Sequence, residues 1–88
     1  MIFDPVKITD VKEKIAELSR SLRSKHQLSQ EQLADEIGVS RITVQNLEAS
    51  KNITLDTLLK VLHHFDLLEK LHLFIKDETD SSSIPSLY

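Results

Sequence analysis

Apolar residues recur at every third or fourth position near the start of the chain. The members of this stripe are Val11, Ile15, Leu18 and Leu22. Such spacing is one face of an amphipathic helix, and Asp10, directly before the stripe, is a suitable N-cap. We therefore expect a helix that is capped by Asp10 and runs to about Lys25. Residues 1–9 are expected to form an extended arm, because Pro5 opposes a helix there.

Two short helices are predicted on either side of the single glycine of the chain. Ser29 and Gln32 have the spacing of a capping box, which marks the start of a helix. Gly38 marks its end, because the left-handed conformation just past a helix terminus favours glycine. Ser40 then caps the next helix, from about residue 41 to residue 49. The apolar side chains expected to face the core from these two helices are Leu33, Ala34, Ile37, Val44 and Leu47.

The segment after a fourth predicted helix fits two patterns. Thr54 is the expected N-cap of that helix, which runs to about residue 65. In residues 66–77, a helix would turn inward the apolar side chains Leu67, Leu68, Leu71 and Phe74. A strand over residues 70–75 would instead place on one face Leu71, Leu73 and Ile75. We favour the strand, because the run LHLFI favours β-structure and ends in charges that would terminate an edge.

The distribution of charge changes what the composition implies. The net charge of −3 at first argues against nucleic acid as a partner. Residues 1–65 are neutral, however, with nine basic and nine acidic side chains, and the whole excess of negative charge lies in residues 66–88. Residues 7–25 carry six basic and three acidic side chains. Because a phosphate surface needs local rather than global positive charge, the N-terminal part is a candidate for DNA binding.

The remaining composition excludes several classes of protein. A chain of 88 residues with 40% hydrophobic residues builds one small domain. The absence of cysteine excludes disulfides and thiolate zinc sites and fits a reducing cytoplasm. No apolar run approaches the ~20 residues of a membrane span, and the N-terminus lacks a signal-peptide pattern. A single glycine leaves no glycine-rich phosphate loop, and the four histidines do not form a metal motif, so we expect no catalytic residue, metal or cofactor.

The stretch SQEQLADEIGVSRITVQNLE, residues 29–48, joins these signals into one motif. Two short helices meet at a tight turn, and the second begins with a polar cluster, which is helix-turn-helix geometry. Residue types and spacing resemble the Cro and phage-repressor (XRE) class, with the pattern Q-x-x-L-A-x-x-x-G-[small]-S-x-x-x-[aliphatic]-x-x-x-E. The resemblance covers about residues 10–65. It implies an all-α, compact, four- to five-helix lambda-repressor-like DNA-binding domain. The resemblance allows, but does not require, a short C-terminal dimerisation strand.

The resemblance also assigns DNA-contacting roles by position. The residues that match base-reading positions are Arg41, Ile42, Gln45 and Asn46. Arg41 can hold guanine O6 and N7, and Ile42 can press on a thymine methyl. Gln45 or Asn46 can hold adenine. The candidates for phosphate contact or helix capping are Gln30, Ser40, Thr43, Lys25, Lys51 and Asn52. For each residue the alternative is ordinary exposed surface.

A carboxylate at the end of the recognition helix needs a separate explanation, because DNA repels it. In the resembled family such a Glu pairs with an Arg of the first helix, which implies a structural ion pair between Glu48 and Arg23. The chain departs from the family at two turns, where Gln27 and Ser50 stand in place of the frequent glycines. The sequence therefore allows those two turns to have a different shape from the glycine turns of the family.

The whole plan of the chain resembles the HipB-like antitoxins. The resemblance rests on the length, on the apolar segment LLEKLHLFI and on the acidic, serine-rich end. It implies a homodimer that binds double-stranded operator DNA with an inverted repeat. The dimer would form through residues 66–77, with the pairing residues Leu71, Leu73 and Ile75. It also implies a HipA-like kinase toxin as partner, as one chain or split in two.

Residues 78–88 are expected to be unfolded in the free protein, because an acidic, serine-rich segment buries little apolar area. Their apolar end, Leu87 and Tyr88, is a candidate docking anchor for the toxin. The alternative is an end without a role. Competing functions for the chain are a prophage repressor, a restriction-modification controller, an antitoxin of another toxin, or a module that binds only protein.

Overall fold

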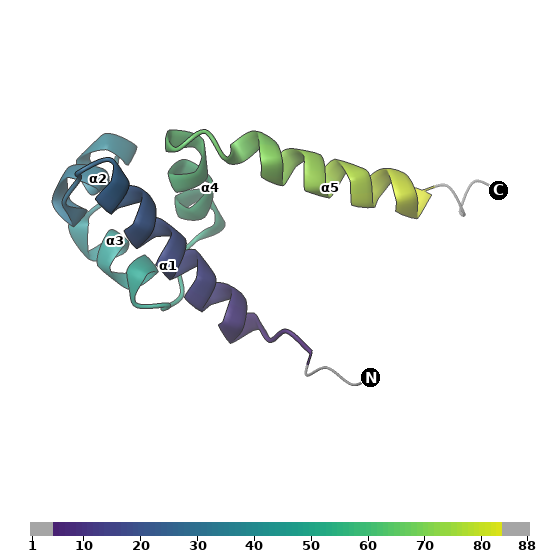
Figure 1. Ribbon diagram of the computed structural model, residues 1–88, viewed down its shortest axis with the longest axis horizontal. Helices are drawn as coiled ribbons and strands as arrows, with labels where there is room; N and C mark the ends of the chain where they lie inside the picture. Colours follow the sequence, from purple (N-terminus) through teal and green to yellow (C-terminus); the bar gives the residue numbers. More distant parts are fainter. Residues whose placement is uncertain (1–4, 84–88) are drawn as a thin grey trace.

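Five α-helices make up the computed structural model, which describes residues 5–83 and contains no strand within that range (Figure 1). The helices are α1 (Ile8–Lys25), α2 (Gln30–Ile37), α3 (Arg41–Glu48), α4 (Leu55–His64) and α5 (Leu68–Ser83). The predicted all-α class is confirmed. The first four helices gather around one core, and α5 extends away from them (Figure 1).

Hydroxyl side chains begin three of the helices as the sequence predicts. Ser29, Ser40 and Thr54 each accept a hydrogen bond from the backbone N–H three residues later. The expectation for Asp10 is wrong, because α1 begins earlier, after Lys7. Asp10 lies inside the first turn, where its Oδ2 accepts a hydrogen bond of 2.9 Å from the backbone N–H of Lys7. A carboxylate is favourable there, close to the positive end of the helix dipole.

Each of the first four helices is followed, one or two residues after its end, by a residue in the left-handed conformation. These residues are Gln27, Gly38, Ser50 and Asp66, with φ between 58° and 76°. In each case the next backbone N–H bonds to the carbonyl five residues earlier, at 2.7–2.9 Å, which is a Schellman motif. The turns at Gln27 and Ser50 therefore have the backbone shape that glycine would favour, and these two residues carry the backbone strain of a left-handed conformation.

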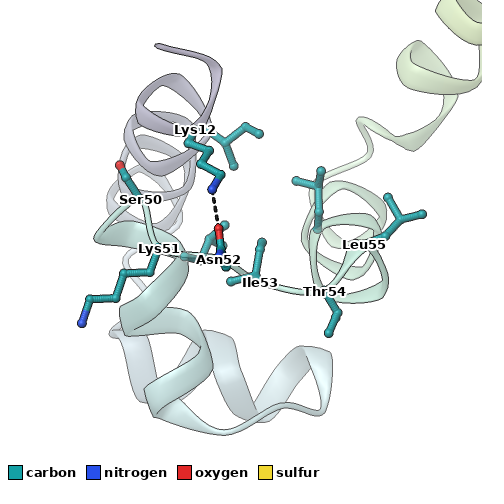
Figure 2. A pocket seen from close by; sticks show the side chains of 10 residues that line it. Lys12, Ser50, Lys51, Asn52, Ile53, Thr54 and Leu55 are labelled. Carbon is teal, nitrogen blue, oxygen red and sulfur yellow. Dashed lines mark hydrogen bonds between the residues drawn. The ribbon is translucent and has the colours of Figure 1, made fainter. Parts of the chain in front are cut away.

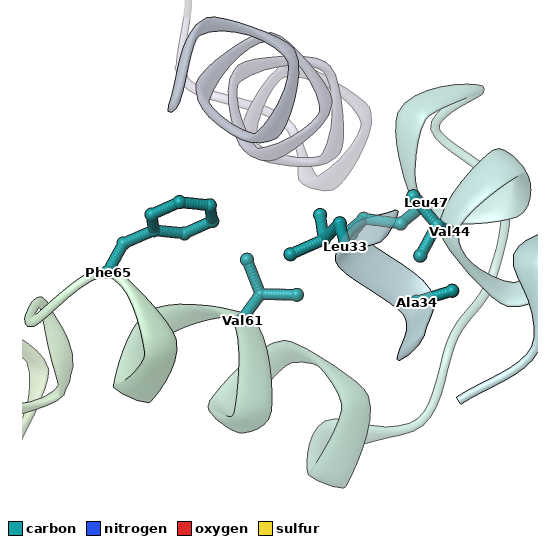
Figure 3. Packing of buried hydrophobic residues seen from close by; sticks show 6 residues of the cluster. All are labelled: Leu33, Ala34, Val44, Leu47, Val61 and Phe65. Atoms are coloured by element: carbon teal, nitrogen blue, oxygen red, sulfur yellow. The ribbon is translucent and has the colours of Figure 1, made fainter. Parts of the chain in front are cut away.

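A small set of side chains forms the core shared by α2, α3 and α4 (Figure 3). Its buried members are Leu33, Ala34, Val44, Leu47, Val61 and Phe65. Ala34 is small enough to let α3 cross α2 closely, as helix-turn-helix geometry requires. The inward positions predicted for α2 and α3 are thus buried, except that Ile37 is only partly buried at the edge of the core.

The predicted strand over residues 70–75 is wrong, because this segment is part of α5. Leu71 is half-buried, whereas Leu73 and Ile75 are exposed. A lone strand leaves its backbone unpaired in water, while a helix satisfies it within the segment. An ion pair between Lys76 and Asp80, one turn apart, adds to the helix.

The end of α5 also corrects the expected unfolded tail. Residues 78–83 continue the helix to Ser83 instead of leaving it after Asp77. The proposed docking anchor, Leu87 and Tyr88, lies outside the described residues. The N-terminal arm over residues 1–9 is described only from Pro5, and its last two positions belong to α1.

Candidate nucleic-acid interface

The rear of α3 is held in the core while its front faces outward. Val44 and Leu47 are 0% and 2% exposed, so they fix the helix against α2. On the other side Arg41 is exposed and Ile42 is 63% exposed. Gln45, Asn46 and Thr43 are half-buried. An aliphatic side chain left largely in water at the start of a rigid helix is suited to contact with an apolar group of a partner, such as a thymine methyl.

Two hydroxyl groups organise the start of α3. Ser40 Oγ accepts a hydrogen bond of 3.1 Å from the backbone N–H of Thr43, and the two hydroxyl oxygens lie 2.8 Å apart. This is helix capping, one of the two roles expected for these residues. It fixes the first turn of α3, which carries the positive end of the helix dipole.

Glu48 at the end of α3 forms the expected ion pair with Arg23 of α1. Arg23 Nη2 lies 2.9 Å from Oε1 and Nε lies 3.0 Å from Oε2, so the contact is bidentate. Ser19 Oγ and Gln30 Nε2 donate two further hydrogen bonds to the carboxylate, at 2.8 and 3.0 Å. Glu48 is 7% exposed. Its charge is thus satisfied within the protein, which reduces the repulsion of a nearby phosphate.

Burial and hydrogen bonding act in opposite directions on this carboxylate. Burial alone would raise the pKa of Glu48, but the hydrogen bonds from Arg23, Gln30 and Ser19 outweigh it and lower the pKa. The hydrogen bond to Glu48 correspondingly raises the pKa of Arg23 against the effect of burial. Both groups are therefore charged at neutral pH, and the network is a fixed link between α1 and α3.

Ser19 and Arg20 belong to this network and were missed by the sequence analysis. Arg20 Nη1 donates a 2.6 Å hydrogen bond to the backbone carbonyl of Glu48, which satisfies a free carbonyl at the end of α3. Ser19 is 1% exposed. The signal that could have found it is its position between Ala16 and Arg23, at spacings of three and four residues, on the inner face of α1.

Gln30 has a partner within the protein, which changes its expected role. One N–H of its side-chain amide binds Glu48, and the side chain is half-buried at the first position of α2. Phosphate binding alone therefore does not describe the role of Gln30. The amide carries a second N–H, so a structural contact and a DNA contact are compatible.

The remaining phosphate candidates lie at the edges of the motif. Lys25 is exposed in the last turn of α1, and Lys51 is exposed in the loop before α4. Asn52 is also exposed, and its Oδ1 accepts a hydrogen bond from Lys12 Nζ (Figure 2). Its NH₂ group is the part that could donate to a phosphate. Figure 2 shows a pocket between α1, the loop after α3 and the start of α4, and the side chain of Lys51 points away from it.

A short exposed helix, fixed from behind and joined to another by a glycine turn, defines a helix-turn-helix protein. The sequence model of the helix-turn-helix family matches residues 20–69, more than half of the chain. The chain therefore belongs to the XRE-type helix-turn-helix family and is a DNA-binding transcriptional regulator. A comparison with curated proteins found no match.

The described part of the chain lacks two other kinds of site. Residues 5–83 contain no group of three or more His, Cys, Asp or Glu side chains that could hold a metal ion. None of the helices in this range is long and apolar enough to cross a membrane.

Proposed function

We propose that the chain is a repressor that binds an inverted-repeat operator as a homodimer and serves as the antitoxin of a HipA-like kinase toxin in the same operon. The observation that carries the repressor proposal is the start of α3. Arg41 and Ile42 are exposed there on a helix whose opposite side is locked in the core. A rigid base-reading element loses little freedom when it enters the major groove.

The side chains of α3 divide between two kinds of base contact. Arg41 reads guanine through O6 and N7, while Ile42 contacts a thymine methyl. Gln45 or Asn46, both half-buried on the same helix, reads adenine through N6 and N7. The proposed phosphate contacts are Lys25, Lys51, the NH₂ group of Asn52, the free N–H of Gln30, and the capped start of α3 at Ser40 and Thr43.

The direction of α5 supports DNA binding by a chain with a net negative charge. Asp77 and Asp80 lie on α5, which extends away from α2 and α3 (Figure 1). Within one chain the acidic side chains are therefore remote from α3, and screening weakens their repulsion beyond about 8–10 Å at moderate salt.

The proposed homodimer uses α5. A single chain leaves its side chains Leu73, Phe74 and Ile75 about half exposed to water. A two-fold dimer would place two copies of α3 on half-sites about one helical turn, ~34 Å, apart. Leu71, also proposed for dimerisation, is half-buried.

The antitoxin role is supported by the plan of the chain, in which a helix-turn-helix is followed by an apolar segment and an acidic end. The test is co-expression with the product of the neighbouring gene. A kinase-like neighbour whose toxicity this chain abolishes supports the role. A restriction enzyme or phage genes beside it would refute it.

DNA recognition is tested by gel shift on the upstream region of the chain's own gene. Arg41→Ala should cost about 1–3 kcal/mol and relax the preference at one base position. Lys25→Ala, the matched control, should weaken operator and random DNA alike and reduce the salt dependence. An equal loss on both DNAs for Arg41→Ala would make Arg41 a phosphate contact. No binding by the unaltered chain would refute DNA recognition.

A further inference from the structure

Helices α1, α4 and α5, which lie outside the helix-turn-helix, carry several exposed apolar side chains. They belong to α1, to the start of α4 and to the middle of α5. The most exposed of them, with 47–77% of the residue surface accessible to solvent, are Ile8, Val11, Leu55, Leu73, Phe74 and Ile75. Because α5 extends away from α1 and from the start of α4 (Figure 1), a single chain does not join these side chains into one patch.

A pocket lies beside Leu55, between α1, the loop after α3 and the first turns of α4 (Figure 2). Its volume is about 240 Å³, and its apolar lining is formed by Ile15, Leu47, Ile53, Leu55 and Leu58. An apolar cavity of roughly 150 Å³ is enough to bind benzene. The pocket therefore has room for one aromatic ring. Lys12 also lines it and places a positive charge at its edge. The pocket borders the proposed DNA surface, because Lys51 and Asn52 line it as well.

Phe74 on α5 is a ring of the right kind, but the chain's own α5 is placed to leave this pocket empty. The pocket is beside Leu55 and Leu58, at the beginning of α4. The helix α5 departs from the other end of α4, about 15 Å further along a ten-residue helix. It then runs away from α1 (Figure 1). The α5 helix of a second copy of the chain is not attached to this α4, so it can reach the pocket.

Charge supports the same occupant. Asp77 follows Phe74 by three residues, so both lie near one face of α5. A helix that seats Phe74 in the pocket brings an acidic residue one turn away from the ring. Lys12 at the edge of the pocket is the complementary charge.

We propose that the two chains of the homodimer exchange their α5 helices. In this arrangement α5 of each chain lies across α1 and α4 of the other, with Phe74 in the other chain's pocket and Asp77 beside its Lys12. The two-fold symmetry makes the contact twice. This inference rests on the proposed homodimer and specifies its interface. A dimer that paired only the two α5 helices would leave Leu55 and the pocket in water.

Disulfide trapping tests the arrangement, because the natural chain has no cysteine. Lys12→Cys and Asp77→Cys proteins are prepared separately, mixed and oxidised. The mixture should give a crosslinked dimer, while Lys12→Cys alone should give none. Lys14→Cys mixed with Asp77→Cys is the matched control, because Lys14 does not line this pocket. Crosslinking by Asp77→Cys alone, with none gained in the Lys12→Cys mixture, would overturn the exchange in favour of direct pairing of α5.

Sedimentation velocity without DNA provides the second measurement. Phe74→Ala should raise the dimer dissociation constant at least tenfold, with little effect on folding, because Phe74 is 61% exposed in one chain. Lys12→Asp should also weaken the dimer, and Lys12→Asp combined with Asp77→Lys should restore it. A Phe74→Ala protein that dimerises as tightly as the natural chain would overturn the proposal.

These results separate the interface from the function. A natural chain that dimerises and shifts its operator, yet fails the trapping experiment, overturns only the exchange of α5. A chain that is monomeric at all concentrations overturns the homodimer and the exchange together, whatever partner then covers the pocket. A natural chain that dimerises but does not shift the operator would refute the proposed DNA recognition alone.

Discussion

Replacing Arg23 with methionine measures how firmly the charge network holds α3. Glu48 is 7% exposed, and without Arg23 its carboxylate keeps only the hydrogen bonds from Ser19 and Gln30. Methionine retains much of the apolar stem of arginine but not its charge. Removing one partner of a buried ion pair costs about 3–5 kcal/mol. Because the Arg23 side chain is 20% exposed, we expect the lower value, about 3 kcal/mol.

The double variant Arg23→Met with Glu48→Leu should recover much of this loss, because it removes the unpaired charge. It should not recover all of it. The hydroxyl of Ser19, 1% exposed, would lose its acceptor at a cost of about 1–3 kcal/mol. Adding Ser19→Ala should therefore stabilise the double variant further.

The assay is urea and thermal unfolding at pH 7, followed by far-ultraviolet circular dichroism. A loss of ~3 kcal/mol lowers the Tm of a domain of this size by roughly 12–24 °C. Lys14→Met is the control, because its ion pair with Glu17 is exposed and contributes at most about 1 kcal/mol. Equal Tm values for Arg23→Met and Lys14→Met would refute the reasoning.

Three further predictions concern the turns, the acid response and Gln30. Gly38→Ala should cost about 1–2 kcal/mol through backbone strain alone, and Ser50→Gly should stabilise by up to about 1 kcal/mol; changes of the same sign in urea unfolding would contradict this. The lowered pKa of Glu48 stabilises the fold above the ordinary Glu value of about 4.3 and is lost as pH falls through the lower folded value. Glu48→Gln should therefore show a shallower fall in the free energy of unfolding between about pH 5 and 3, and a parallel curve would refute it. Gln30→Ala should lower the free energy of unfolding without DNA by about 1 kcal/mol; unchanged unfolding with weaker operator binding would leave Gln30 as a phosphate contact only.

Several local features could be read from the sequence because their causes lie within a few residues. The hydroxyls of Ser29, Ser40 and Thr54 cap helices by bonding to N–H groups three positions away. Gly38 ends α2 because it adopts φ 76° without strain. These signals, together with the helical spacing of apolar residues, were sufficient for four helices and for the helix-turn-helix itself.

Other turns could not be predicted because the residues in them do not favour their conformation. Gln27 and Asp66 are left-handed without being glycine. Each is followed by an apolar residue, Leu28 or Leu67, that packs against the core. Burial of that residue offsets the local strain, and whether it is buried depends on the other helices.

The state of residues 70–75 was decided by what surrounds them. The run LHLFI is compatible with both periods, and such a short apolar run does not distinguish a strand from a helix. The segment follows the turn at Asp66 directly, so its backbone continues into a helix that satisfies its own hydrogen bonds. The sequence also contains no information on the direction of α5, which places Asp77 and Asp80 away from α3 (Figure 1).

The chemistry of α3 itself was determined locally, whereas its support came from far along the chain. Ile42 is outward because Val44 and Leu47 on the same helix are inward, and this follows from helical period alone. Arg41, at the first position of α3, lies at the side of the inward face and is exposed. Ser19, Arg20 and Gln30 reach Glu48 across 29, 28 and 18 residues of sequence. Those contacts exist only because α1 and α2 cross α3 at a particular angle. A crossing angle depends on how three side-chain surfaces pack together, and no single stretch of sequence encodes it.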